Sequence, residues 1–336
     1  MSNTNAFAIQ RGFHYQDMVG LIEFLDNIEN VKAVNVEGED DIDLIFENDR
    51  IYYYQAKETI KPHDGKMSGE FKDALKTLDN DAQDDNMERI IYVSNSTQPL
   101  GDLKGSKQFI PSYALYKYDE LEPNLQKKLD RHNFINVTNN LDKLFFLKIS
   151  YEGSDDRTKL REFNDRVDEF VEKTKLNGYK RELANEWQQM IIRSNEEKSR
   201  TVAKKDFYAH TVITVIFSNK TKSSDFEDFL ECFDVDYENE CYIKEQYSEL
   251  VDELYTDFDL VNTIYQAHRK FQIKYSNLSR KKRLKKFIDE FYPTLKEILN
   301  YSNSKDDDIV KFIIWVAIKS YNLKDDIGEA IGYANN

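Results

Sequence analysis

Between residues 37 and 57 the chain alternates polar and apolar side chains with the two-residue period of a β-strand. The alternation comes in two short segments joined by a polar turn, which is typical of a hairpin. Because successive side chains of a strand point to opposite faces, Asp41 and Asp43 share one face of the first strand. Gln55 and Lys57 likewise share one face of the second strand. The pattern therefore predicts a hairpin with one polar and one apolar face.

The turn sets which residues of the two strands lie opposite each other. A three-residue loop at residues 48–50 would pair Asp43 with Gln55 and Asp41 with Lys57. A slip of one residue would move the polar set of one strand to the other face of the hairpin.

Outside the hairpin, the period changes along the chain. Strand-like and helix-like segments alternate in residues 1–150, whereas most segments in residues 151–336 have the three- to four-residue period of an amphipathic helix. We therefore predict an α/β domain over 1–150 and a mostly α-helical domain over 151–336. Further strands are expected at 31–36, 90–93, 113–118, 134–137 and 144–149, and helices of the first domain at 13–29, 70–78 and 119–131.

The polar face of the hairpin has a specific chemical use. Hard divalent cations such as Mg²⁺ bind one or two carboxylates together with carbonyl, water and phosphate oxygens, which Asp41, Asp43 and Gln55 could join. A lysine beside such a metal orients water or offsets negative charge that develops on a phosphoryl group, a role open to Lys57. The alternative is a half-buried hairpin whose acidic face is simply solvated. Glu37 either adds a carboxylate to the site or is a solvated loop acid.

The order of these residues resembles a known family. Asp43, followed by Gln55-Ala56-Lys57 on the next strand, resembles the core of the PD-(D/E)-x-K nuclease superfamily in the form where glutamine replaces the middle acid. The pattern is most similar to Mrr-like restriction endonucleases. Upstream, the stretch Arg11 to Gln16 (RGFHYQ) opens a helix, and an E-x-x-D-D-I run follows it at residues 37–42. This order is similar to the double-stranded DNA endonuclease domain of CBASS antiphage effectors.

The resemblance implies a fold, an activity and a site. The fold is a restriction-endonuclease-like α/β core, a mixed sheet flanked by helices, and the activity is Mg²⁺- or Mn²⁺-dependent hydrolysis of double-stranded DNA. Gln55 would be a metal ligand through its side-chain oxygen, and Lys57 the catalytic lysine. The Mrr pattern points to Asp43 as the primary metal carboxylate, whereas the D-D-I pattern points to Asp41. Gln16 resembles the helix residue that approaches such sites.

The resemblance also implies a role in bacterial antiphage defence, with a separate ATPase or sensor protein as partner. The chain has neither GxxxxGK[ST] nor G-x-G-x-x-G, so we expect any ATP hydrolysis to belong to such a partner. The alternative is an adaptor or structural subunit that keeps the nuclease fold without cleaving. RNA in place of DNA stays open as a substrate.

Two groups of basic residues are candidates for contacts with the nucleic-acid backbone. Lys61 and Lys66 lie in the polar loop after the second hairpin strand. Residues 280–286 contain six basic residues in seven, beginning with Arg280, Lys281, Lys282 and Arg283, which could neutralise several phosphates. The alternative for this run is the basic side of a surface helix that pairs with acidic neighbours.

Composition limits the remaining possibilities. The 336 residues carry a formal net charge of −15, which argues against a simple DNA-coating protein and favours a homo-oligomer or a partner that helps DNA binding. Two cysteines are too few for a disulfide framework. No apolar run approaches the roughly 18 residues of a membrane span, and the start of the chain lacks signal-peptide features, so we expect a cytoplasmic protein without a membrane anchor.

Overall fold

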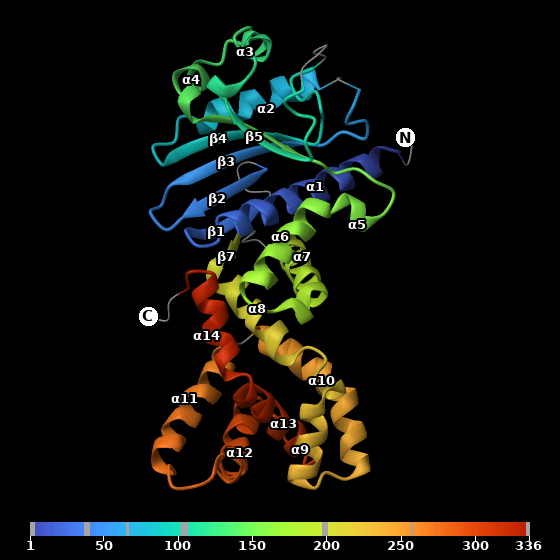
Figure 1. Cartoon of the computed structure of the whole chain (residues 1–336), viewed down its shortest axis with the longest axis vertical. Helices are drawn as coiled ribbons and strands as arrows, with labels where there is room; N and C mark the ends of the chain where they lie inside the picture. Colours follow the sequence, from blue (N-terminus) through green and yellow to red (C-terminus); the bar gives the residue numbers. More distant parts are fainter. Residues whose placement is uncertain are drawn as a thin grey trace. The chain divides into compact units, whose positions relative to one another are not determined.

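The computed structural model describes residues 4–36, 41–64, 67–101, 107–196, 201–256 and 258–333 (Figure 1). The chain forms two compact units, residues 1–207 and 208–336, called here the first and the second unit. Glu37 and Lys66, two of the predicted site residues, lie outside the described residues. Among the helices of the described ranges, none has the length and hydropathy that a bilayer crossing requires.

The first unit is built on a mixed seven-stranded sheet with the strand order β5-β6-β4-β3-β2-β1-β7. Strands β3, β4 and β6 run parallel to one another, and the other neighbouring pairs are antiparallel. The predicted α/β core is therefore confirmed at the level of a mixed sheet with flanking helices. The strands are β1 (Val31–Val36), β2 (Ile42–Phe46), β3 (Ile51–Lys57), β4 (Met87–Ser94), β5 (Tyr113–Lys117), β6 (Leu144–Ile149) and β7 (Thr201–Ala203).

Helices cover both faces of this sheet (Figure 1). Helix α1 packs on one face, where Tyr54 of β3 donates a hydrogen bond to Glu23, and α2 packs on the other face over Tyr53 and Tyr92. Adjacent residues of β3 thus reach the two opposite cores, as strand alternation requires. The helices of the first unit are α1 (Thr4–Asp26), α2 (Ser68–Asp81), α3 (Pro123–Leu129), α4 (Ile135–Asn139), α5 (Asp156–Lys159), α6 (Arg161–Lys173) and α7 (Lys180–Glu196).

The expected domain boundary at residue 150 lies inside the first unit. Helices α6 and α7 pack against α1, and β7 pairs with β1 at the edge of the sheet. Phe24 of α1, Trp187 of α7 and Phe207 form one aromatic cluster, with ring centroids 5.0 and 4.7 Å apart. The segment after residue 150 therefore completes the core of the first unit, because it covers the side of α1 that faces away from the sheet.

The strand predicted at 134–137 is wrong, because this segment forms α4. The reason is a long-range cap: Asp79 of α2 accepts hydrogen bonds from the backbone N–H groups of Asn136 (2.8 Å) and Val137 (2.9 Å). These are the groups that a helix leaves unsatisfied at its start. The apolar residues of the segment suit a buried helical turn as well as a strand, and Val137 is buried in the core under α2.

Within its described residues, the second unit consists of helices joined by turns and short connections, without a strand. Helix α13 lies at its centre and packs against α9, α10, α11 and α12. Nine of its fourteen residues are buried, which fits a helix with neighbours on several sides. The mostly helical C-terminal region is thus confirmed. The helices are α8 (Lys204–Phe217), which begins in the first unit, α9 (Ser224–Phe233), α10 (Tyr237–Thr256), α11 (Asp259–Lys274), α12 (Arg280–Ile298), α13 (Asp306–Lys319) and α14 (Tyr321–Ala330).

Candidate active site

The hairpin β2–β3 has the predicted polar face but not the predicted register. Asp43 lies opposite Tyr53, not opposite Gln55, so the pairing is shifted by two residues. The connecting loop is centred one residue earlier than expected: the N–H of Phe46 donates to the carbonyl of Arg50, and Asp49 takes the left-handed conformation with φ 58°. A shift of two residues keeps every side chain on its predicted face. The polar face is therefore preserved, whereas the cross-strand pairs change.

Three of the predicted residues meet at the start of β2 and the end of β3. Lys57 Nζ donates to Asp41 Oδ2 and to Gln55 Oε1, both at 3.2 Å. The backbone N–H of Ala56 donates to the same Asp41 oxygen at 2.8 Å. The side chains of Asp41 and Lys57 keep 18% and 27% of their exposure, so the group is reachable from solvent. A carboxylate, a carboxamide oxygen and an ammonium thus converge on one accessible point.

Asp43 lies further along the same face and has different neighbours. It is buried, and Asn35 of β1 donates to its Oδ2 at 3.4 Å. Asp41 contacts Lys57 directly. The observed register places Asp41 level with Gln55, and which of the two aspartates is the primary metal ligand stays a prediction.

The donor set fits a divalent cation whose coordination is completed by water and substrate. Within the described residues, no three His, Cys, Asp or Glu side chains lie close enough together to hold a metal ion. Mg²⁺ does not need such a cage, since it commonly binds one or two carboxylates plus water and phosphate oxygens. Asp41 Oδ2 is occupied by hydrogen bonds, but Oδ1 accepts none from the described part of the chain. Asp41 Oδ1 is accordingly the oxygen that would bind Mg²⁺ or Mn²⁺, and Gln55 Oε1 could join it once Lys57 releases it.

Helix α1 reaches the residue that follows β3 through Arg11, whereas the part predicted for Gln16 stays a prediction. Gln16 Oε1 is buried and accepts no hydrogen bond from a described residue. Arg11, one turn earlier, forms an ion pair with Glu58 (2.7 Å), the residue that directly follows β3, and donates to the carbonyl of Tyr151 (3.1 Å). Burial raises the pKa of Glu58, and the Arg11 guanidinium partly offsets this effect. Arg11 thus fixes the segments that leave β3 and β6.

A second lysine, which the sequence analysis missed, lies on the same face of the sheet. The parallel register places Lys57 opposite Ser94, and Ser94 opposite Lys148. Lys148 is 1% exposed and donates to Ser150 Oγ at 2.7 Å. Burial lowers the pKa of its ammonium. A lysine within the apolar run LFFLKI was the available sequence indication, because lysine is rarely buried without a specific role.

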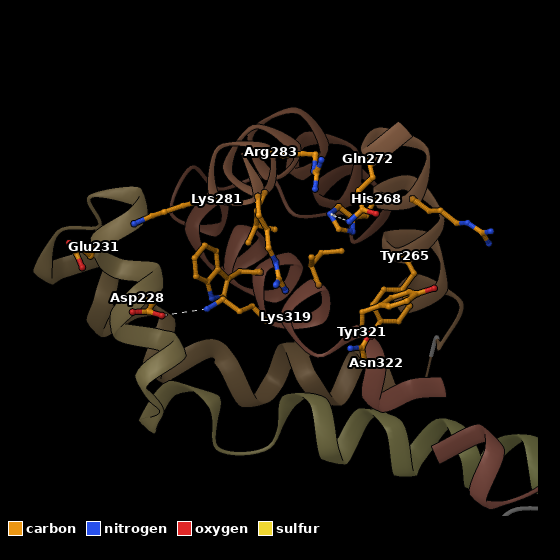
Figure 2. Close-up of a pocket in the computed structure, with 15 residues that line it drawn as sticks. Asp228, Glu231, Tyr265, His268, Gln272, Lys281, Arg283, Lys319, Tyr321 and Asn322 are labelled. Carbon is orange, nitrogen blue, oxygen red and sulfur yellow. Dashed lines mark hydrogen bonds and ion pairs between the residues drawn. The ribbon is translucent and has the colours of Figure 1, made fainter. Parts of the chain in front are cut away.

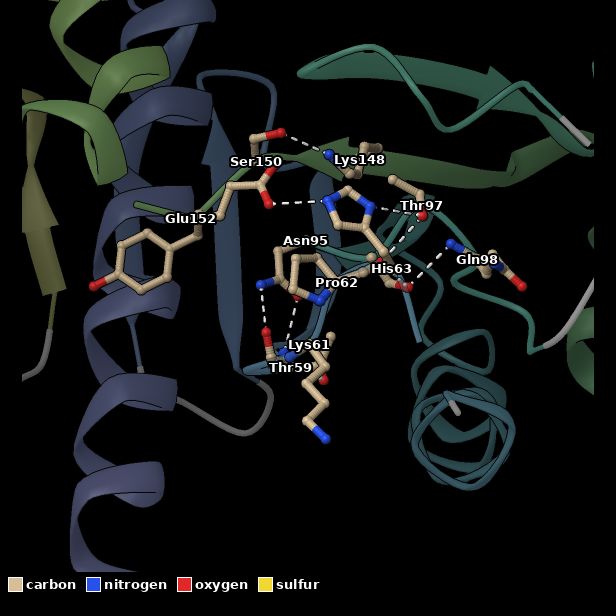
Figure 3. Close-up of polar contacts among 12 residues, drawn as sticks. Thr59, Lys61, Pro62, His63, Asn95, Thr97, Gln98, Lys148, Ser150 and Glu152 are labelled. Atoms are coloured by element: carbon tan, nitrogen blue, oxygen red, sulfur yellow. Dashed lines mark hydrogen bonds and ion pairs between the residues drawn. The ribbon is translucent and has the colours of Figure 1, made fainter. Parts of the chain in front are cut away.

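The loops that follow β3, β4 and β6 are tied together beside this row, as Figure 3 shows. Asn95 bonds both backbone groups of Thr59, accepting from its N–H (2.9 Å) and donating to its carbonyl (2.8 Å). His63 lies between Glu152 (Nε2 to Oε2, 3.2 Å) and Thr97 (Nδ1 to Oγ1, 3.4 Å). Lys61, the predicted contact with the nucleic-acid backbone, therefore lies in a loop that hydrogen bonds connect to the neighbouring loops.

The predicted nucleic-acid residues divide between the two units. Lys61 is exposed, and Figure 3 shows its ammonium directed away from the contacts between the loops. Arg280, Lys281 and Arg283 belong to the second unit and line a pocket there, whereas Lys282 does not line it.

Comparisons with known proteins leave the family open. No protein-family model matches the chain, and neither does any curated protein. The chain is similar in structure to the Cap4 SAVED/CARF-domain containing receptor of Acinetobacter baumannii, solved alone and with the cyclic trinucleotides 3'3'3'-cAAA and 2'3'3'-cAAA. The sequence identity is 19–20% and the TM-score 0.41, over 61% of this chain and 45–47% of the receptor chains. The chain thus spans less than half of the receptor's length, and a likeness of this size identifies neither fold nor function.

Proposed function

We propose that the first unit is a metal-dependent DNA endonuclease with a restriction-endonuclease-like fold, and that Asp41, Gln55 and Lys57 form its active site. The observation that carries this proposal is that Lys57 Nζ donates to both Asp41 Oδ2 and Gln55 Oε1 at 3.2 Å. Asp41 directly precedes β2, and Gln55 and Lys57 lie at the end of β3. PD-(D/E)-x-K nucleases place their site residues on two such neighbouring strands and in the same order. The position beside the carboxyl ends of parallel strands is also where α/β folds commonly bind ligands.

Each residue has a separate task in this proposal. Asp41 and Gln55 would hold Mg²⁺ or Mn²⁺ through Oδ1 and Oε1, and the bound metal would activate a water and polarise the phosphoryl group. Lys57 would exchange its present acceptors for a non-bridging phosphate oxygen or the attacking water, and so offset the negative charge that develops there. Asp43 is buried beside Asn35, further along the same face of the sheet, where its carboxylate would help to stabilise the bound cation.

The biological setting is proposed on the sequence resemblance alone. We propose that the chain is an antiphage defence effector that cuts double-stranded DNA and works with a separate ATPase or sensor protein. The net charge of −15 supports a homo-oligomer or a partner, because an acidic monomer would be repelled by the DNA backbone.

The second candidate function, an adaptor that keeps the fold without cleaving, has two observations in its favour. These are the negative net charge and the lack of a three-acid group within the described residues. It differs from the nuclease in needing no metal, so metal binding separates the two functions.

Supercoiled-plasmid cleavage in Mg²⁺ or Mn²⁺ tests the activity, with calorimetric titration of Mn²⁺ as a readout that does not depend on cleavage. We expect the wild type to bind the metal and to nick the plasmid. Lys57→Ala should lose cleavage but keep metal binding, and Asp41→Ala should lose both. Lys127→Ala is the matched control, since it removes an exposed lysine of α3 that belongs to none of the predicted sites, and should keep both. A wild type that binds no metal would instead support the adaptor.

A further inference from the structure

The second unit contains a pocket of about 950 Å³, which lies within the range of small-molecule sites. Its walls come from α9, α11, α12, α13 and the start of α14. Figure 2 shows side chains from these separate helices around one space, among them Tyr265, Lys281 and Lys319. All of its lining residues belong to the second unit, so the pocket does not depend on how the two units are arranged.

The lining is strongly cationic, although the chain as a whole is acidic. Five lining residues are basic and two are acidic, which gives the pocket a net charge of +3 while the chain carries −15. The one lining histidine, His268, does not add to this charge near neutral pH, because burial and the nearby Arg283 lower its pKa to about 4. An excess of positive charge inside a concave site favours an anionic ligand.

Most of these cations have no acidic partner among the described residues. Arg269, Arg280, Lys281 and Arg283 form no ion pair with any residue that the structure describes. The next basic residues of the same run behave differently, since Lys286 pairs with Glu290 at 3.7 Å. The alternative, that the run pairs with acidic neighbours, therefore does not hold for the residues that face the pocket. Guanidinium groups that are not paired with carboxylates are a typical arrangement for binding phosphate.

The backbone of α12 adds to this preference. The helix begins at the pocket, and its first four residues are all basic, with no acidic residue in the first turn. Ser279 precedes them but caps no N–H group with its side chain. The start of a helix carries unsatisfied N–H groups and the positive end of the helix dipole, so cations there are unfavourable unless an anion is bound. A phosphate at this position would satisfy both the side chains and the backbone.

A different part of the lining is aromatic. Tyr265 and Trp315 line the pocket but are only 4% and 3% exposed, whereas Tyr321 is 38% exposed. Tyr321 meets Tyr265 edge to face, with the ring centroids 4.9 Å apart (Figure 2). A flat ring that solvent can reach favours a planar group in the ligand.

We propose that this pocket binds a nucleotide, a nucleoside that carries two or more phosphates. The phosphates would contact Arg280, Lys281 and Arg283 at the start of α12. The base would lie against the exposed ring of Tyr321. A lone inorganic phosphate would leave most of the 950 Å³ unused. A DNA duplex would meet the exposed cations without placing a base in the pocket. The proposal is independent of nuclease activity in the first unit.

Calorimetric titration of the full-length chain with ATP and GTP tests this proposal, with adenosine, tripolyphosphate and a short DNA duplex as the comparison ligands. We expect a nucleoside triphosphate to bind more tightly than either of its parts. Arg280→Gln and Arg283→Gln should each weaken binding about tenfold or more, since each removes a charge-assisted hydrogen bond. Lys282→Gln is the matched control: it removes the same charge from the same helical turn but does not line the pocket, and should leave affinity within about twofold.

Tryptophan fluorescence gives a second readout, because the chain has only two tryptophans, Trp187 and Trp315. The nucleotide should change the emission of the wild type but not that of Trp315→Phe. The proposal is overturned if no nucleotide binds at millimolar concentration, or if Lys282→Gln weakens binding as much as Arg283→Gln does. Equal affinity for tripolyphosphate and ATP would reduce the pocket to an anion site. Binding of duplex without mononucleotide would make it a nucleic-acid surface. Thermal melting confirms that each variant is folded.

Discussion

The two units surround their cations in opposite ways. In the first unit Lys57 is held by Asp41 and Gln55, so the positive charge has its acceptors within the protein. In the second unit Arg280 and Arg283 face a pocket without a carboxylate partner among the described residues. A cluster that is neutralised internally is stable as it stands and must release its lysine when a metal or a phosphate arrives. A cluster without internal partners gains stability only from an external anion.

The two clusters should therefore respond differently to substitution. Removing one member of a satisfied cluster leaves the other members without partners, which is costly in a partly buried site. Removing one cation from an unpaired group relieves repulsion. The first kind of residue should therefore be needed for both structure and function, and the second kind for ligand binding alone.

The largest effect is expected in the first unit, where Asp41 and Asp43 can be distinguished. We expect Asp41→Asn to lower the cleavage rate by about 10²- to 10³-fold, as for the loss of one directed electrostatic contact in an active site. Asp43→Asn should cost about tenfold, because Asp43 lies opposite Tyr53 and further from Lys57. Both substitutions keep the shape of the side chain. Initial rates of plasmid nicking at saturating Mn²⁺ provide the measurement, and a larger effect at Asp43 would return the primary role to that residue.

The outcome at Asp41 and Asp43 bears on how much of the site the sequence could predict. The period of two placed both aspartates on one face with Gln55 and Lys57, and this was right because a shift of two residues changes pairs but not faces. The choice between the aspartates depended on the register, which is set by the left-handed conformation of Asp49 in the turn. The periodicity of the strands contains no information about the conformation of that turn.

Other features could not be predicted from the sequence, because residues far away in the chain determine them. Helix α4 depends on a cap from Asp79, 57 residues before Asn136 in the chain. The burial of Lys148 follows from the position of β6 between β4 and β5. The basic run was visible as a run, but helix packing alone decides that Arg283 lines the pocket while Lys282 does not.

The first unit also contains a buried acid whose hydrogen-bond partners are hydroxyl groups and not a cation. Glu23 of α1 accepts hydrogen bonds from Tyr54 (2.9 Å) and Tyr113 (3.4 Å). Burial and the nearby Asp26 raise its pKa to about 7, although the two tyrosines and Arg166 act in the opposite direction. Hydroxyl donors alone therefore do not stabilise this carboxylate as an ammonium would.

The raised pKa of Glu23 predicts how stability changes with pH. Between its ordinary pKa of 4.5 and about 7, the folded state holds a proton that the unfolded state has lost, so stability falls as the pH rises through this window. The full loss, reached above pH 7, is about 3 kcal/mol. Glu23→Gln removes this dependence. Its free energy of unfolding relative to the wild type should therefore increase by that amount between pH 4.5 and 8, as measured by urea denaturation. Glu172→Gln, at an exposed position of α6, should show no such change. A difference that is constant with pH would mean that Glu23 is ionised throughout.

The smallest effect, and the most direct test of the comparison, concerns the stability of the ligand-free chain. Arg283 lies in the first turn of α12 among other cations, where its charge opposes the helix dipole. At low ionic strength we expect Arg283→Gln to raise the free energy of unfolding by about 0.3–1 kcal/mol, and Lys57→Gln to lower it because Asp41 and Gln55 lose their donor. Salt should reduce the gain at Arg283, since it screens the repulsion from the exposed Arg280, Lys281 and Lys282. It should leave the loss at Lys57 largely unchanged, because that loss comes from direct hydrogen bonds. Thermal melts in low and high sodium chloride measure both effects. A change of the same sign in both variants would show that internal pairing is not what distinguishes the two clusters. Opposite signs, with the gain confined to low salt, would mean that the pocket arginines reduce the stability of the free protein and are therefore explained by a ligand.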